Sequence, residues 1–522
     1  MPPDKRGHDN DPLTKPVYGS ETIGSGTPDP GFNMQGSRQA AMQFPVRLLL
    51  SAALLAALAP MTVAVAQDAT APVGPFDADA DFGRLRGSDG QEAVDLFNTT
   101  LTNQPLPTET PEAGRAQRGE RLAPTIAQED EAPLRPRART ADARDASAYD
   151  PLGIRVGSFV VLPSIEMRGG YTTNAAGSST GGPSAVWTLV PDLTVRSDWS
   201  RHELGFVLHG TYDYFSDTSV APLPTVNAGA NARIDLPRDW ALRLRGNYNY
   251  QTQSISSLDY PTGVEKPPGI NTYVGGATLD GSVGRTVLQL RGNVAYSQYN
   301  DGHVGDIVVP QGDRDNTLVS GAARVGYEVT PAFTPFVEAE LSDRSFKQKI
   351  DNNGFNRASQ GVTLRGGIAY SAAPVLTGEV ALGWHHERYD DAVFKPFDAM
   401  TVDASVIWSP TPLTNFTLRA ATFVNPTTDP NSAGSIVYDA GIRAEHALRR
   451  NLTLEGDLGW RREYYEGINV ADVTYQAGFG VTWKLNREAW VVGRFSQEYY
   501  HSAVPGGSYP TTTVSVGLRL QR

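Results

Sequence analysis

The sequence predicts an all-β fold: a transmembrane, antiparallel up-and-down β-barrel of about eighteen strands, with sixteen as the alternative count. Three observations lead to this prediction. Long segments alternate between apolar and polar residues, the connections between them alternate between short and long, and aromatic residues gather at the segment ends. Many long strands with one apolar and one polar face are typical of a barrel with lipid outside and water inside.

The clearest segment covers residues 240–251. Its even positions hold Trp, Leu, Leu, Gly, Tyr and Tyr, whereas its odd positions hold Ala, Arg, Arg, Asn, Asn and Gln. Successive side chains of a strand point to opposite faces, so one face is apolar and the other is polar and cationic. The segment is also about twice as long as an ordinary globular strand. Such a strand suits a membrane better than a soluble sheet.

Variants of this pattern fill the chain from residue 153 onwards. The eighteen segments are expected at residues 158–172, 184–197, 202–215, 224–236, 240–252, 270–284, 286–298, 315–329, 333–346, 359–371, 375–388, 397–409, 414–424, 435–447, 452–465, 472–485, 489–500 and 511–521.

The connections between these segments carry independent information. Tight ones, such as Pro237-Arg-Asp239 and Gly284-Arg285, alternate with long ones, such as residues 253–269 and 299–314. Outer-membrane barrels have short periplasmic turns and long outer loops. The alternation therefore favours such a barrel over a soluble sandwich, and an even strand count places both ends on the periplasmic side.

Aromatic residues concentrate at both ends of the segments. Because amphipathic rings favour the headgroup level of a bilayer, two girdles are predicted. The alternative is that aromatic residues are simply common in strands. The tight-turn set is Trp199, Trp240, Trp408, Trp483 and Trp490, and the long-loop set includes Tyr171, Tyr212, Tyr248, Tyr296, Tyr464, Tyr499 and Tyr500.

The two faces of the segments differ in charge. The apolar faces predicted to meet lipid carry no Arg or Lys, each of which would cost about 2–4 kcal/mol near the midplane. The opposite faces carry many arginines and carboxylates, so the interior is wet or densely paired. Eighteen strands leave an aqueous lumen unless a loop folds in. Clear lipid-facing sets are Leu288, Leu290 and Val294; Val380, Leu382 and Trp384; and Val514, Val516, Leu518 and Leu520.

Six charged residues are the candidates for setting selectivity in the lumen. The arginines could form a basic ladder on neighbouring strands, and the glutamates an acidic counterpart two strands further on. Charged walls facing each other across a pore produce a transverse field and an ion preference. The alternative is cross-strand salt bridging that shapes the lumen. The candidates are Arg233, Arg243, Arg245, Arg291, Glu338 and Glu340.

No catalytic residue, metal or cofactor is expected. The chain has no cysteine, which removes disulfides, zinc–thiolate sites and cysteine nucleophiles, and its net charge of −12 argues against nucleic acid. His385 and His386 are adjacent, so on a strand they face opposite ways and cannot easily share a metal. Residues 313–316 and 351–354 are oxygen-rich but lack EF-hand spacing and are predicted as polar turns. An enzyme at the barrel rim is the third hypothesis.

The N-terminal part predicts export. Arg47 is followed by the apolar run Leu48–Leu58, and Ala64-Val-Ala66 provides a small-x-small cleavage site, so residues 42–66 are interpreted as a cleaved signal peptide. Residues 1–41 form a polar upstream extension, which is not translated if Met34 or Met42 is the true start. Residues 67–150 lack apolar periodicity and are predicted to be a disordered periplasmic arm. The barrel is assigned to residues 151–522.

Four short stretches resemble a known family. Tyr149-Asp-Pro-Leu-Gly-Ile-Arg-Val-Gly-Ser-Phe159 leads into Leu162-Pro-Ser-Ile-Glu-Met-Arg-Gly-Gly-Tyr-Thr-Thr-Asn174, and Pro191-Asp-Leu193 and Arg196-Ser-Asp-Trp-Ser-Arg-His202 follow. Together they resemble the putative β-barrel porin type 2 family of Gram-negative outer-membrane proteins, over about residues 150–522. The resemblance implies an outer-membrane barrel and, by the family's name, a pore.

The resulting expectation is a porin-like channel for passive diffusion of small hydrophilic solutes, exported to the cell outer membrane, with selectivity set by lumen charges. The alternative is a non-conducting barrel with a structural or surface-binding role through its outer loops. Expected partners are outer-membrane lipid, the outer-membrane assembly machinery and small hydrophilic solutes, without nucleic acid. The solute and the number of protomers stay open.

Overall fold

The structure, a computed structural model, describes residues 149–522 except 239, 262, 265, 373, 374 and 469. The predicted upstream extension (1–41) and signal peptide (42–66), and the predicted arm as far as residue 148, lie outside the described residues. Among the described residues, no helix is long and apolar enough to cross a bilayer.

The described chain is built of strands. Their bounds are β1 (Ile154–Val156), β2 (Phe159–Thr172), β3 (Ser184–Ser197), β4 (Glu203–Phe215), β5 (Leu223–Leu236), β6 (Trp240–Thr252), β7 (Gly269–Val283), β8 (Thr286–Tyr299), β9 (Gly302–Val304), β10 (Ile307–Val309), β11 (Asn316–Tyr327), β12 (Phe333–Phe346), β13 (Ser359–Ala372), β14 (Leu376–Tyr389), β15 (Phe397–Thr411), β16 (Thr414–Asn425), β17 (Ser435–Arg449), β18 (Leu452–Tyr465), β19 (Val470–Lys484), β20 (Ala489–His501) and β21 (Tyr509–Gln521).

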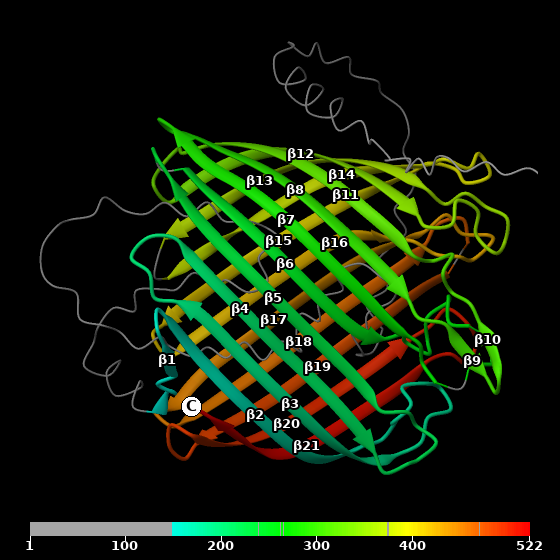
Figure 1. Ribbon diagram of the computed structural model, residues 1–522, viewed down its shortest axis with the longest axis horizontal. Coiled ribbons are helices and arrows are strands. Elements are labelled where there is room, and N and C mark those ends of the chain that lie inside the picture. The colour runs from blue at the N-terminus through cyan, green and yellow to red at the C-terminus, as the bar shows by residue number, and fades with distance from the viewer. Residues whose placement is uncertain (1–148, 239, 262, 265, 373–374, 469) are drawn as a thin grey trace, which may run out of the picture. The chain divides into compact units, whose positions relative to one another are not determined.

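Eighteen of these strands, β2–β8 and β11–β21, form one closed antiparallel barrel (Figure 1). Consecutive barrel strands pair with each other, β8 pairs with β11, and β21 pairs back with β2 from Ser164↔Gln521 to Thr172↔Thr513. The short strand β1 lies against the start of β2, and β9 and β10 form a separate hairpin. Closure leaves no long unpaired edge, as a bilayer requires. The predicted barrel is confirmed, with eighteen strands.

The predicted segments match the barrel strands closely. No boundary differs by more than two residues, and the strands are 12 to 15 residues long. The agreement has a physical basis, because a strand between lipid and a polar lumen must alternate along its whole length. The pattern therefore reports both ends of each strand.

The connections mostly alternate as predicted, with one exception. Tight turns use left-handed residues, such as Gly284 with φ 63° and Arg238 with φ 65°. On the loop side, however, β18 and β19 are separated only by residues 466–469. That connection is short because Val470 and Ala471 still pair with Tyr465 and Tyr464, so the two strands extend further outwards. Short and long connections therefore do not alternate throughout.

The outer face is apolar, as predicted. Leu290, Leu382 and Val516 are 54%, 56% and 60% exposed, and the girdle residues Trp408 and Trp483 are also exposed. No lipid is present, so these exposures mark the surface that hydrocarbon would cover.

Three aromatic residues assigned to the girdles contradict that prediction. Trp490 is buried on the lumen side, where the Lys484 ammonium lies 4.7 Å from the centre of its ring. Tyr500 is also buried, and its hydroxyl donates to a loop carbonyl. Tyr465, which was assigned to the long-loop girdle together with Tyr464, is buried as well. All three follow from strand parity, because neighbouring positions on one strand cannot face the same side.

Candidate functional site: the lumen and its outer mouth

The lumen wall contains a continuous chain of ion pairs whose centre is Glu338 on β12. This carboxylate receives Arg291 Nη2 at 3.0 Å, Arg324 Nε at 2.7 Å and Arg365 Nη1 at 2.9 Å. The Glu338 side chain is almost fully buried. Three guanidinium groups around one carboxylate satisfy both of its oxygens with charge-assisted hydrogen bonds.

The chain of ion pairs extends in both directions around the wall. Arg324 Nη1 lies 3.0 Å from Glu379 Oε2 on β14, and Arg365 contacts Glu340 at 2.6 Å and Asp403 on β15 at 2.9 Å. With Arg291 on β8, six consecutive strands contribute. We call these three arginines and four carboxylates the β8–β15 belt. It has one carboxylate in excess.

The six predicted selectivity residues fall into two groups. Arg291, Glu338 and Glu340 belong to the β8–β15 belt, where Arg291 bonds Glu338 directly on the same wall. This is the cross-strand pairing considered as the alternative to two opposing charged walls.

The other three predicted residues lie on β5 and β6. Arg233 and Arg243 are register neighbours, but each has its own carboxylate: Asp235 Oδ1 at 2.9 Å from Arg233, and Asp280 beside Arg243. Arg245 Nη2 donates to Asn293 Oδ1 on β8 at 3.0 Å. These arginines therefore lie next to one another as the predicted ladder requires, but carboxylates neutralise Arg233 and Arg243.

Inward-facing glycines let long side chains lie flat against this wall. Arg245 passes over Gly276 on β7, where an added Cβ would come 2.8 Å from its Nε. Likewise the Arg494–Glu455 ion pair, 2.7 Å long, joins β20 to β18 across Gly480, where a Cβ would come 2.9 Å from Nη1. Any larger residue at these glycines would push the guanidinium into the lumen. The glycines therefore let these charged side chains lie against the strands instead of projecting into the lumen.

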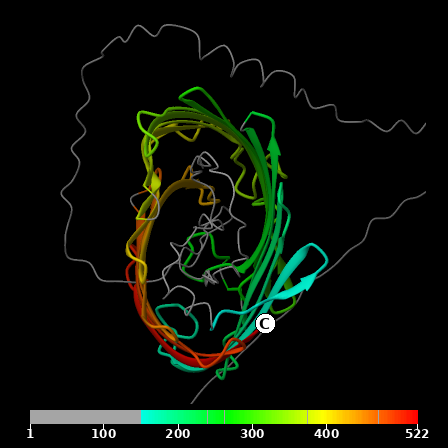
Figure 2. The ribbon, with the colours of Figure 1, turned by 90° about the vertical axis from the view of Figure 1, so that its left-hand side faces the viewer.

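The outer mouth is crossed by the loop between β6 and β7. The Asp259 carboxylate accepts hydrogen bonds from Thr427 Oγ1 at 2.8 Å, from the Thr428 backbone N–H at 2.9 Å and from Thr428 Oγ1 at 3.1 Å. Strands β6 and β17 are nine strands apart in either direction around the ring. Asp259 therefore joins opposite sides of the barrel, whose outline is flattened in end view (Figure 2).

The same loop has anchors on other strands. Tyr500 OH on β20 donates to the Ser256 carbonyl at 3.1 Å, and Tyr509 OH on β21 donates to Ser256 Oγ at 3.2 Å. Arg314 Nη1, from the β8–β11 connection, donates to the Asp259 carbonyl at 3.3 Å. Residues 253–261 are therefore held from three directions. A loop therefore folds across the outer mouth, as the sequence analysis had allowed.

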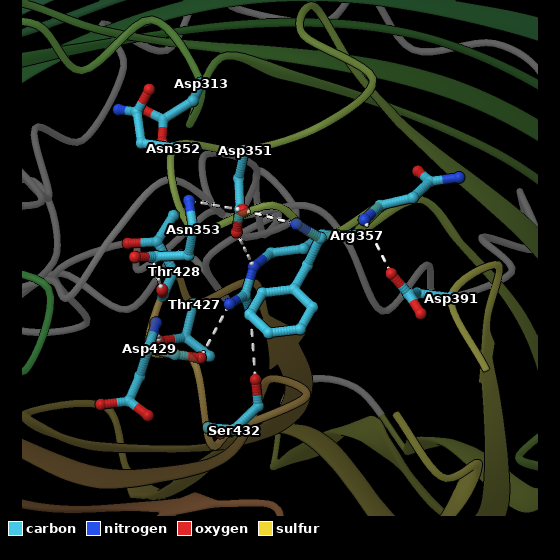
Figure 3. Close-up of polar contacts among 12 residues, drawn as sticks. Asp313, Asp351, Asn352, Asn353, Arg357, Asp391, Thr427, Thr428, Asp429 and Ser432 are labelled. Carbon is cyan, nitrogen blue, oxygen red and sulfur yellow. Dashed lines mark hydrogen bonds and ion pairs between the residues drawn. The ribbon is translucent and has the colours of Figure 1, made fainter. Parts of the chain in front are cut away.

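Arg357 ties three outer loops together (Figure 3). Its Nε lies 2.5 Å from Asp351 Oδ2, Nη1 donates to the Ser432 carbonyl at 2.9 Å, and Nη2 donates to the Asp429 carbonyl at 2.7 Å. Its guanidinium also stacks 4.8 Å from the ring centre of Phe394. One buried side chain thus connects the β12–β13, β14–β15 and β16–β17 loops.

Electrostatics also link the β8–β11 and β12–β13 loops. Lys347 Nζ lies 3.0 Å from Asp315 Oδ2, and this hydrogen-bonded ion pair raises the pKa of Lys347. The Asp315 carboxylate also accepts the Tyr299 backbone N–H at 2.8 Å. The carboxylates of the oxygen-rich loops are engaged within the protein too. Asp313 and Asp351 accept hydrogen bonds from neighbouring backbone N–H and arginine groups. They behave as polar turns.

The two histidines face opposite ways. His385 is buried between Thr363 Oγ1, 2.8 Å from its Nδ1, and Glu387 Oε2, 2.9 Å from its Nε2. His386 contacts Asp398 and stacks on Trp384 on the outer face. Among the residues that the structure describes, no group of three or more His, Cys, Asp or Glu side chains is placed to hold a metal.

Sequence reasoning missed the Asp259 contacts and the role of Arg357. Both join loops that are far apart in the chain, by 168 residues for Asp259 and Thr427. Loop residues have no periodicity, so no local pattern marks such contacts. The only available signal was the length of the β6–β7 connection.

Comparison with solved structures finds proteins of low similarity. OpdK from Pseudomonas aeruginosa is 12% identical, with 69% of this chain and 99% of that chain covered and a TM-score of 0.35. OccAB2 from Acinetobacter baumannii is 11% identical, with 70% and 99% covered and a TM-score of 0.35. The copper transporter OprC is 8% identical, with 71% and 81% covered and a TM-score of 0.39.

Comparison with curated protein sequences finds no match. The family model described as "Putative beta-barrel porin 2" matches residues 147–522, which include the complete barrel and most of the chain. The match agrees with the resemblance found in the opening motifs. The chain therefore belongs to the putative beta-barrel porin 2 family.

Proposed function

We propose that this protein is an outer-membrane channel for passive diffusion of small hydrophilic solutes. The observation that carries the proposal is a closed eighteen-strand barrel whose outer face is apolar and whose inner face is lined with charge. A barrel of this width is too large for its own side chains to fill. Polar walls and a wide interior favour water and dissolved solutes over a packed core.

The lumen charges would set the ion preference of the channel. The β8–β15 belt holds its groups in fixed positions through short ion pairs, so a passing ion meets a constant pattern of charge. One excess carboxylate on this wall favours cations over anions of equal size. The paired arginines on β5 and β6 add polar contacts without a large net charge.

The outer mouth would set the size limit. Residues 253–261 cross from β6 towards β17 and are held by Asp259 and Ser256. A solute arriving from outside would pass beside this loop before it reaches the belt. The loop thus divides the functions of the pore, with size selected at the mouth and charge selected along the wall.

Export through a cleaved signal peptide, insertion by the outer-membrane assembly machinery and a bilayer environment complete the proposal. The apolar outer belt and the exposed Trp408 and Trp483 support the bilayer environment. N-terminal sequencing of the mature protein would test the cleavage after Ala66.

A second candidate is a non-conducting barrel whose outer loops bind a partner. The observation that favours it is the number of contacts that tie the outer loops across the mouth, centred on Asp259 and Arg357. In that case the in-folded loop closes the lumen instead of narrowing it. The barrel itself would be the same in both cases.

Planar-bilayer recording separates the two candidates. Purified protein whose folding has been shown by heat-modifiable migration in SDS gels should give discrete conductance steps, and liposomes containing it should swell in small sugars or amino acids. Folded protein without steps would rule out the open channel. If steps then appeared in an Asp259→Ala variant, the loop would be identified as the plug.

A further inference from the structure

The lipid-facing surface carries a groove near the tight-turn end of strands β17–β21. Its volume is about 590 Å³, and most of its lining is apolar. We call it the β17–β21 groove. Its lining residues are Arg449, Asn451, Leu452, Val481, Trp483, Val491, Gly493 and Val516.

The groove exists because one outward position lacks a side chain. Gly493 on β20 lies in register between Val481 on β19 and Val516 on β21. A Cβ added at Gly493 would have no atom within 4 Å, so the space above it is open. Valine side chains stand on both sides of this gap and form its walls. The result is an open slot between Val481 and Val516 on the outward face.

The turn end of the groove is polar and cationic. Register between β17 and β18 shifts between Ala447 and Arg449, and such a bulge re-aims the side chains beside it. Among the described residues, Arg449 makes no ion pair or hydrogen bond through its side chain. Asn451 adds an amide next to it, and Trp483 marks the headgroup level.

We propose that the β17–β21 groove binds a phospholipid from the leaflet at the tight-turn end. The phosphate would lie against the Arg449 guanidinium, which forms strong charge-assisted hydrogen bonds with phosphate oxygens. The Asn451 amide would meet the glycerol esters. One acyl chain would lie in the slot above Gly493, between Val481 and Val516. The cationic rim of the groove and the apolar slot below it thus match the phosphate and the acyl chain of a phospholipid, in the same order.

A second copy of the chain fits this site less well. Two copies that met at this groove would bring two Arg449 side chains into an apolar contact without a carboxylate in the lining to neutralise them. A phosphate supplies that missing negative charge. The proposal depends on the barrel lying in a bilayer and does not depend on conduction.

Native mass spectrometry of the detergent-purified full chain with added phosphatidylglycerol tests the proposal. Arg449→Gln should reduce the lipid-bound share about tenfold, the size expected for one charge-assisted contact. Gly493→Leu should reduce it similarly by filling the slot. With diacylglycerol, which lacks the phosphate, only Gly493→Leu should have an effect.

Two matched controls complete the experiment. Arg238→Gln changes a tight-turn arginine far from the groove, and Gly246→Leu adds a leucine at another outward glycine with open space above it. Both should bind lipid like the unaltered chain. Equal binding by all four variants would overturn the proposal in favour of a general lipid shell. A change in the dimer fraction with Gly493→Leu, without loss of lipid, would identify a second copy as the occupant.

Discussion

The wall of the lumen and its outer mouth are held together in different ways. In the β8–β15 belt, ion pairs join residues on strands that are neighbours or nearly so, such as Arg324 and Glu338, which are directly opposite in register. At the mouth, contacts join segments up to 253 residues apart in the chain, such as Ser256 and Tyr509. The wall contacts reinforce strand pairs that the backbone already forms, whereas the mouth contacts are independent of strand pairing.

Because of this difference, the stability of the barrel and the opening of its outer mouth should depend on different contacts. Removing a wall contact leaves unpaired buried charges among paired strands, which lowers the stability of the whole barrel. Removing a mouth contact releases a loop while the strands stay paired. We therefore expect wall variants to change stability and ion preference, and mouth variants to change the conductance of the open pore.

The largest expected effect is that of Glu338→Ala in the wall. It leaves three buried guanidinium groups without their shared carboxylate and should lower the free energy of unfolding by about 3–5 kcal/mol. The measurement is the temperature at which the fast-migrating form disappears from SDS gels. Glu340→Ala is the matched control, because this carboxylate has one arginine partner and is partly exposed. Equal loss in both variants would show that Glu338 is not the centre of the belt.

The next effect is that of Arg357→Met at the mouth. The apolar stem is kept, but the bonds to Asp351 and to the carbonyls of Asp429 and Ser432 are lost. Each hydrogen bond of a charged group is worth about 1.5–3 kcal/mol, so local opening of these loops should rise strongly. Limited proteolysis should cut the β12–β13 and β16–β17 loops, while the melting of the barrel changes little. If the melting temperature of the barrel fell as well, the mouth contacts would not be independent of the wall.

A smaller change in stability but a clear change in conductance is expected for Asp259→Ala. The variant removes the acceptor of three hydrogen bonds from Thr427 and Thr428, so residues 253–261 should lose their attachment to the β16–β17 loop and restrict the mouth less. Single-channel conductance should rise. Asp259→Asn keeps the oxygen that accepts these bonds and should stay near the conductance of the unaltered chain. The reverse order of the two variants would refute the assignment.

The smallest effect is expected at the tight-turn end. Gly284→Ala forces an L-residue into a left-handed conformation with φ 63° and should cost about 1 kcal/mol. Conductance should not change, since no cross-lumen contact begins at this turn among the described residues. Any increase in conductance from this variant would show that part of the restriction lies at the tight-turn end and not at the outer mouth.

The sequence predicted the wall far better than the mouth. Strand positions such as 240–252 were predictable because lipid on one side and water on the other impose a period of two. Cross-strand salt bridging was foreseen as one of two alternatives, and the Arg291–Glu338 ion pair on one wall is an example of it. Arg357 and Asp259 were not foreseen, because a loop contact across the lumen depends on three-dimensional closure and leaves no repeat in the chain.

A disulfide between the β6–β7 and β16–β17 loops tests the central claim most directly. The natural chain has no cysteine, so an Asp259→Cys/Thr427→Cys pair would be the only thiols. Oxidation should restore the link across the mouth and hold conductance near that of the unaltered chain, and reduction should raise it reversibly in the same membrane. Identical conductance in both states, with the disulfide verified by mass spectrometry, would contradict the claim that this loop sets the opening.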